Sequence, residues 1–111
     1  MHKIHLDLNY QTFQDELFAL QKVEQVAFLN TCKKIRKMTW DMLHRDKGIH
    51  FEEILNKKSK SGNKLYSIRF SQKYRAVVIR DSDYLIFLSI HTDHDSAQII
   101  LKNAVEANCV F

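Results

Sequence analysis

The sequence has no proline, only two glycines and no long apolar run in its 111 residues. Because so few residues interrupt regular structure, the chain has few strong breaks. No stretch approaches the roughly 20 apolar residues that cross a bilayer, so we expect no membrane segment and no membrane partner. The N-terminus, MHKIHLDLNY, lacks the apolar stretch and small-residue cleavage site of a secretory signal.

Cysteine is also scarce. Cys32 and Cys109 are too few for a disulfide framework, and they lie in no spacing typical of metal ligands. We therefore expect both thiols to be reduced and the protein to be cytoplasmic.

The residues that are present favour one folded domain over residues 1–111. A chain of this length can bury one modest core. A hydrophobic share of 45% with twelve aromatic residues is typical of a globular protein rather than a disordered tail.

Charge is unevenly distributed along the chain. Residues 33–80 contain fourteen lysines and arginines against four acidic residues, whereas both flanking segments are mildly acidic and bring the net charge to +4. A basic middle is typical of a protein that binds a polyanion, most simply nucleic acid. A solvated lysine-rich surface would give the same pattern, so other features have to decide.

Helical spacing dominates the first half of the chain. After a short expected edge strand at residues 4–8, Thr12 is a candidate helix cap, and a second helix is expected over residues 22–37. Thr39 is a candidate cap for a short third helix that ends before Gly48.

The period of the apolar residues changes from 3.6 to 2 after a polar, basic loop at residues 57–64. The segments 65–70, 74–79 and 84–90 then predict three strands joined by hairpin connections. Residues 95–108 return to helical spacing. The predicted fold class is α+β, with N-terminal helices packed on one face of a three-stranded antiparallel meander, a possible edge strand and a C-terminal helix.

Side-chain alternation predicts two different faces for this meander. The face expected to pack on the helices is nearly all apolar and holds Tyr66, Ile68, Phe70, Tyr74, Ala76, Val78, Ile86, Leu88 and Ile90. The opposite face is expected to gather the polar residues, and function is expected there. These residues are Ser67, Arg69, Arg75, Ser89 and His91.

A cluster of histidines and aspartates, HTDHDSAQ, follows the third strand. A metal site is one interpretation, because His91 and His94 are three residues apart and Asp93 or Asp95 could add a carboxylate. The segment crosses from a strand end to a helix start, so a register that brings the imidazoles together is not assured. We expect no metal and no other cofactor.

Proton transfer is the second interpretation. Histidine titrates near neutral pH and can act as a general acid or base, and arginine suits a phosphate and the charge of its transition state. RNA carries its own nucleophile, the 2′-hydroxyl, so a histidine beside arginines can cut RNA without metal. In the simplest structural interpretation, Asp93 and Asp95 only cap the last helix and the histidines face solvent.

The combination of these features resembles the RelE/ParE superfamily of bacterial toxins, in particular the RelE-type mRNA interferases. The likeness rests on Tyr66-x-x-Arg69, on Tyr74-Arg75, on the segment HTDHDSA, and on TWDMLHRDKGIHFEEI upstream. It covers roughly residues 39–98, and the N-terminal helices only in kind.

This resemblance implies a RelE-like fold and a toxin that enters the ribosomal A site, cuts mRNA and is silenced by a cognate antitoxin. Arg75 matches the family arginine that contacts the scissile phosphate, and Arg69 keeps the basic character of its position, whereas Ser67 does not. The family's tyrosine or other acid/base group near the last helix would fall near Gln98, and glutamine cannot transfer a proton.

We therefore expect Arg75 and Arg69 to hold the phosphate, and His91 and His94 to share proton transfer. Five lysines are expected to bind RNA: Lys57, Lys58, Lys60, Lys64 and Lys73. Two alternatives stay open, a non-catalytic ParE-like toxin that acts on DNA gyrase and a dormant member that binds only RNA or an antitoxin.

Overall fold

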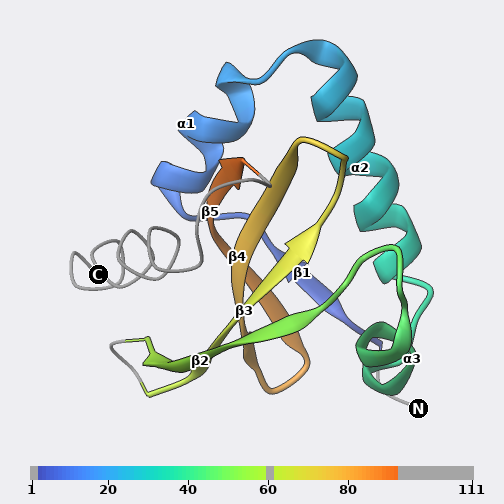
Figure 1. Ribbon diagram of the computed structural model, residues 1–111, viewed down its shortest axis with the longest axis vertical. Helices are drawn as coiled ribbons and strands as arrows, with labels where there is room; N and C mark the ends of the chain where they lie inside the picture. The colour runs from blue at the N-terminus through green and yellow to red at the C-terminus, as the bar shows by residue number, and fades with distance from the viewer. Residues whose placement is uncertain (1–2, 60–61, 93–111) are drawn as a thin grey trace.

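Three helices lie against one face of a five-stranded sheet in the computed structural model, which describes residues 3–59 and 62–92 (Figure 1). The α+β fold class is thus confirmed. In chain order the elements are β1 (His5–Asp7), α1 (Gln11–Ala19), α2 (Lys22–Ile35), α3 (Trp40–Arg45), β2 (Glu52–Lys58), β3 (Lys64–Arg69), β4 (Tyr74–Asp81) and β5 (Tyr84–Thr92).

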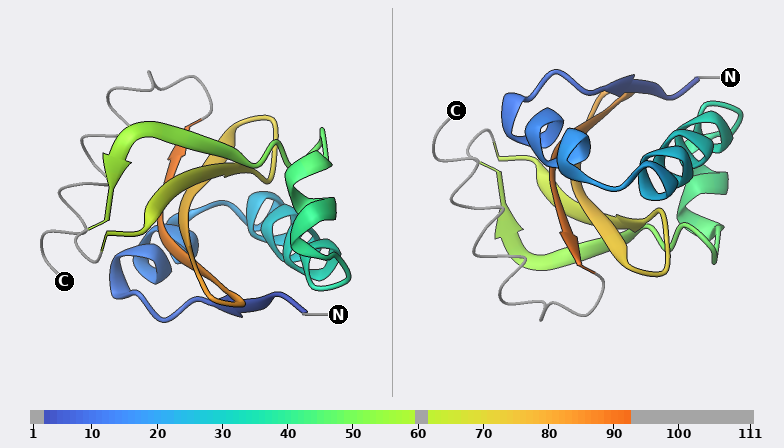
Figure 2. Two further views of the ribbon diagram at one scale, coloured as in Figure 1. Left: turned by 90° about the horizontal axis from the view of Figure 1, so that it is seen from below. Right: turned by 90° about the horizontal axis from the view of Figure 1, so that it is seen from above.

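The strands lie in the order β1-β5-β4-β3-β2. The pairs β2–β3, β3–β4 and β4–β5 are antiparallel, and β1 pairs in parallel with β5. β2 and β1 are therefore the two edge strands, at opposite edges of the twisted sheet (Figure 2). The predicted meander and the predicted edge strand are confirmed. The C-terminal helix predicted at residues 95–108 lies outside the described residues.

Strand β2 differs from the sequence prediction, because its last two residues belong to the segment 57–64 that is expected to be a loop. Its sequence, EEILNKK, has only two apolar residues, so it shows neither the alternation nor the apolar run that would indicate a strand. Backbone pairing makes it one, because Glu52 lies opposite Ser67 and Lys58 lies opposite Lys64. The loop of residues 57–64 is correspondingly shorter than expected.

Of the two helix caps predicted from the sequence, one is confirmed and the other is wrong. The Thr39 hydroxyl accepts a hydrogen bond from the Met42 N–H (3.1 Å), as predicted for the cap of α3. The Thr12 prediction is wrong, because α1 already begins at Gln11 and its N-cap residue, Tyr10, makes no side-chain capping bond. A side-chain bond from Gln14 Nε2 to the Leu8 carbonyl (2.7 Å) ties this end of α1 to the incoming chain.

A cluster of four phenylalanines joins the helices to the sheet. Phe28 of α2 lies 5.3–5.4 Å, centroid to centroid, from Phe13 of α1, Phe70 after β3, and Phe87 of β5. All four side chains are buried, and the contacts are tilted or edge-to-face, as aromatic pairs prefer. This cluster holds both long helices on one face of the sheet.

The pairing of β4 with β5 contains a β-bulge. Val77 lies opposite Ser89, but the next residue, Val78, lies opposite Phe87, so Leu88 is the extra residue. The bulge reverses the alternation before it, so that Leu85 and Phe87 join Ile90 in packing on the helices. The predicted placement of Ile86 and Leu88 on that face is therefore wrong, and both contribute to a second apolar cluster.

This second cluster lies on the sheet face that points away from the helices. Its buried members are Leu65, Val77, Ile79 and Leu88. Leu65 and Ile79 form one cross-strand pair, whereas Arg69 and Arg75 form another pair at the far end of the same two strands. The face is thus apolar at one end and polar at the other. No helix among the described residues is long and apolar enough to cross a membrane.

The phenylalanine cluster predicts a large difference between two neighbouring positions of α2. Phe28 is fully buried, so Phe28→Ala should lower the free energy of unfolding by about 3–5 kcal/mol. Leu29, which is 52% exposed, is the matched control, and Leu29→Ala should change it by no more than about 0.5 kcal/mol. Urea denaturation measures both. Similar losses for the two variants would contradict the assigned core.

Candidate functional site

The sheet face that points away from the helices is called the outer face here. Its polar end is built from a row of three residues, one on each of three neighbouring strands. Arg69 of β3 lies opposite Arg75 of β4, and Arg75 lies opposite His91 of β5. Directly opposed residues on one face are in side-chain contact range. The structure therefore brings together three of the four residues predicted to be catalytic, and the fourth, His94, lies outside the described residues.

Arg69 and Arg75 bring two guanidinium-bearing side chains to this row, and Arg75 is 9% exposed. An arginine donates charge-assisted hydrogen bonds to phosphate oxygens in a planar fork. The row is thus suited to a phosphate.

Two serines of the next row orient these side chains. Ser67 and Ser89 flank Val77 in the register of the three strands. Arg75 donates from Nη2 to Ser67 Oγ at 2.7 Å, and Ser89 Oγ lies 2.8 Å from His91 Nε2. These bonds fix the direction of the guanidinium and imidazole groups along the sheet face.

A pair of residues that the sequence analysis missed lies next to this row. His50 Nε2 is 2.6 Å from Glu52 Oε2, and Arg75 Nη2 donates to the His50 carbonyl at 3.3 Å. Glu52 lies opposite Ser67, which places this carboxylate beside the serine that holds Arg75. A carboxylate that accepts a hydrogen bond from an imidazole holds the ring in one orientation.

The two histidines differ in access. The His50 side chain is 49% exposed, whereas His91 is 8% exposed. His50 also has a positive φ of 54°, which is uncommon for a residue other than glycine. The i, i+2 spacing of His50 and Glu52 in HFEE was a possible signal, but without recognition of β2 it had no structural meaning.

The chain before β2 forms a tight turn against α2. Asp46 accepts the Ile49 N–H at 2.8 Å and lies 3.0 Å from Lys34 Nζ. The bond from the Ile49 N–H, followed by the attraction of Lys34, holds the pKa of the Asp46 carboxyl below its usual value. This carboxylate therefore stays ionised and fixes the turn that carries His50.

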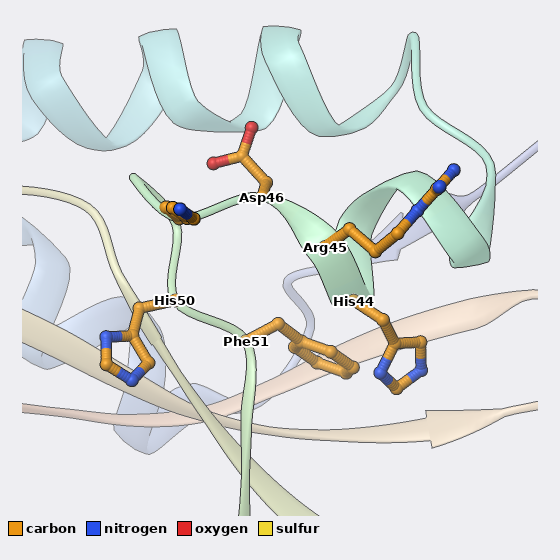
Figure 3. Close-up of a pocket in the computed structure, with 6 residues that line it drawn as sticks. His44, Arg45, Asp46, His50 and Phe51 are labelled. Atoms are coloured by element: carbon orange, nitrogen blue, oxygen red, sulfur yellow. The ribbon is translucent and has the colours of Figure 1, made fainter.

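A pocket of about 330 Å³ opens on this turn (Figure 3). In the close-up, His44 and His50 lie on either side of Phe51, and the Asp46 carboxylate points toward α2. Phe51 stacks on Tyr66 with centroids 4.4 Å apart, and His44 meets the edge of Phe51 at 4.8 Å. Because Phe51 is 8% exposed, these contacts pack the turn against the sheet and leave little of its ring accessible.

The lysines predicted to bind RNA are partly placed. Lys58 and Lys64 form a cross-strand pair, Lys64 lies 3.7 Å from Glu53, and Lys73 is exposed in the turn between β3 and β4. Lys57 belongs to β2 rather than to a loop. Lys60 lies outside the described residues.

Within residues 3–59 and 62–92, no three His, Cys, Asp or Glu side chains lie together as a potential metal site. Asp93, His94 and Asp95 of the predicted cluster lie outside this range.

Comparisons with known proteins give little. No family model matches the chain, and no curated protein matches it. One solved structure, a copper-bound mutant toxin from Helicobacter pylori, aligns over 84% of this chain and 96% of its own at 16% identity, with a TM-score of 0.44. A likeness of this size assigns no function.

One acidic residue supports the strand that carries His91. β1 pairs with β5 only as far as Ile86, and beyond it Glu16 Oε1 of α1 accepts the Ile90 N–H at 2.9 Å. Burial of the Glu16 carboxyl raises its pKa above the usual value, because the effect of burial is larger than that of the bond from Ile90, which lowers the pKa. The negative charge of Asp15 raises it slightly further.

The raised pKa of Glu16 predicts a pH-dependent effect of Glu16→Gln. The ionised carboxylate costs free energy in the folded state, and the cost disappears as pH falls through the raised pKa toward the unfolded value. Gln keeps the acceptor without the charge, so the variant should be more stable than wild type at pH 7, with a gain that shrinks toward pH 4.

Urea denaturation between pH 4 and 7 measures this effect. Glu24→Gln is the matched control, because Glu24 lies in the first turn of α2 and its loss should weaken the helix slightly. A Glu16→Gln variant that is less stable at pH 7, or whose effect is the same at every pH, would contradict this account.

Proposed function

We propose that this protein is the toxin of a type II toxin–antitoxin system and inhibits translation by cutting mRNA on the ribosome without a metal. The observation that carries the proposal is the row in which Arg69 faces Arg75 and Arg75 faces His91. The resemblance of residues 65–98 to RelE-type toxins and the basic middle of the chain support the same function. The proposed partners are ribosome-bound mRNA and a cognate antitoxin.

In the proposed reaction the RNA 2′-oxygen attacks the adjacent phosphorus. A general base takes the 2′-hydroxyl proton, the bond from phosphorus to the 5′-oxygen breaks, and a general acid protonates that leaving oxygen. The products are a 2′,3′-cyclic phosphate and a 5′-hydroxyl. Negative charge builds on the phosphate oxygens in the transition state, so a nearby arginine stabilises the transition state more than the substrate.

The roles follow from the positions in the row. Arg75 and Arg69 hold the phosphate, and His91, at the other side of Arg75, transfers one proton. His50 is assigned the second proton transfer, because its imidazole is accessible and its Glu52 partner orients the ring. His94, predicted for this role from the sequence, stays a candidate.

A general attraction for RNA is assigned to the exposed lysines. Lys58, Lys64 and Lys73 would contact phosphates of the ribosome or message without base specificity, and the same is proposed for Lys57 and Lys60. Such contacts make binding strongly dependent on salt.

The second candidate is a dormant member that binds RNA or an antitoxin without cutting. The observation that favours it is burial, because Arg75 is 9% and His91 8% exposed, and serines already engage both side chains. Little of either side chain is therefore accessible to a phosphate. The following measurement separates the two functions.

The proposed cleavage predicts that Arg75→Lys is much slower than wild type. Lysine keeps the charge but loses the planar fork of donors, so single-turnover cleavage on programmed ribosomes should slow by about 100- to 1,000-fold. His91→Ala or His50→Ala should slow it by about 100- to 10,000-fold. Ribosome binding, measured in parallel, should stay near wild type for all three variants.

Arg80→Lys is the matched control. Arg80 lies on the same strand but on the opposite face, where its guanidinium carbon is 4.0 Å from the centre of the Trp40 ring. It should cut within about twofold of wild type, because it touches no reacting group. A wild-type protein that binds programmed ribosomes without cutting would select the dormant alternative, and equal rates for all four variants would overturn the assignment of the site.

A further inference from the structure

A second pocket, of about 320 Å³, lies at the Arg69 end of the row that Arg69, Arg75 and His91 form. It is formed between the C-terminal half of α2, the turn before β2, and the turn that joins β3 to β4. The lining residues that can contact an anion are Thr31, Lys34, Arg69, Ser71 and Gln72. Arg69 therefore belongs both to this pocket and to the proposed cleavage site.

The charge around the pocket favours an anion. Lys34 and Arg69 are its charged lining residues, and none of the residues that line it is acidic. Asp46, which lies 3.0 Å from Lys34 Nζ, offsets one of the two cations. The C-terminal end of α2 has a partial negative charge, but four exposed basic side chains outweigh it, those of Lys33, Lys34, Arg36 and Lys37.

The pocket also offers neutral donors and an apolar wall. Ser71 Oγ accepts the N–H groups of Lys73 (3.2 Å) and Tyr74 (3.1 Å), which fixes the oxygen and leaves its own proton to donate. Gln72 is exposed beside it, and Ile49 and Phe70, which are 3% and 6% exposed, line the pocket with the small apolar part of their side chains that is accessible. Cations and hydroxyl donors beside apolar surface suit a phosphate that is attached to a sugar and base, rather than a free inorganic anion.

We propose that this pocket is a binding subsite for the nucleotide next to the scissile phosphate. Lys34 and Ser71 hold its phosphate, and Ile49 and Phe70 contact the sugar or base. The inference rests on the proposed function, because the shared residue Arg69 connects the two phosphates. It adds a residue of α2 and the turn after β3 to the RNA path, which otherwise follows the outer sheet face.

The test uses a 2′-O-methyl RNA tetranucleotide, which lacks the nucleophile and reports binding without cleavage. In an NMR titration of the full chain, the amide signals of Gly48, Ser71 and Gln72 should shift and saturate. Lys34→Gln should weaken the Kd by about tenfold, as expected for the loss of one charged contact. Lys33→Gln, on the same helix but outside the pocket, should weaken it less than about twofold.

A second variant, Gln72→Glu, is needed because Lys34 also pairs with Asp46, so Lys34→Gln could weaken binding by disturbing the turn that Asp46 holds. Gln72 is exposed, so the variant should fold, and the added charge should weaken the Kd by about tenfold through repulsion of the phosphate. Gln21→Glu, the same change at the other end of α2, should leave it unchanged. Equal effects of Gln72→Glu and Gln21→Glu, or pocket signals that do not shift, would overturn the subsite.

Inorganic phosphate distinguishes the source of the anion. At the same concentration as the tetranucleotide, inorganic phosphate should not shift the amide signals of the pocket residues. If phosphate shifted these signals to saturation with the same Kd as the tetranucleotide, the assignment of the pocket to RNA would be overturned. The outcomes also separate the two proposals. Cleavage by wild type without pocket shifts would reject the subsite alone, whereas saturable shifts without cleavage would support the subsite and reject the proposed nuclease.

Discussion

The register of β4 against its two neighbours is the constraint on which the other features depend. On one face it gives the helices an apolar surface on which Phe28 packs between Phe70 and Phe87. On the other face it places Arg75 between Arg69 and His91. A shift of one residue would exchange the two faces, so core packing and the proposed site are fixed by the same pairing. The bulge at Leu88 lets β5 satisfy both.

The proposed chemistry depends on how this arrangement holds Arg75. The Ser67 hydroxyl and the His50 carbonyl both accept from Arg75, so the guanidinium is held in place before any substrate binds. A group fixed in this way needs little reorganisation when charge develops on a phosphate, which is the condition for electrostatic stabilisation of a transition state.

Sequence patterns predicted the parts of the fold that depend on local alternation. β3 and β4 pair without a bulge, so side-chain alternation alone placed Arg69 and Arg75 on one face correctly. The bulge could not, because Leu88 is apolar like its neighbours and only packing of Phe87 on the helices selects it. The His50–Glu52 pair was missed for another reason. It depends on a left-handed turn and on a strand whose sequence shows no alternation.

The central claim is that the row of Arg69, Arg75 and His91 promotes attack by the RNA's own 2′-hydroxyl. Analysis of the ends left on a message after incubation of wild-type protein with programmed ribosomes tests it most directly. The account predicts a 2′,3′-cyclic phosphate, or the 3′-phosphate formed from it, on one fragment and a 5′-hydroxyl on the other. A 3′-hydroxyl with a 5′-phosphate, the pattern of attack by activated water, would contradict it.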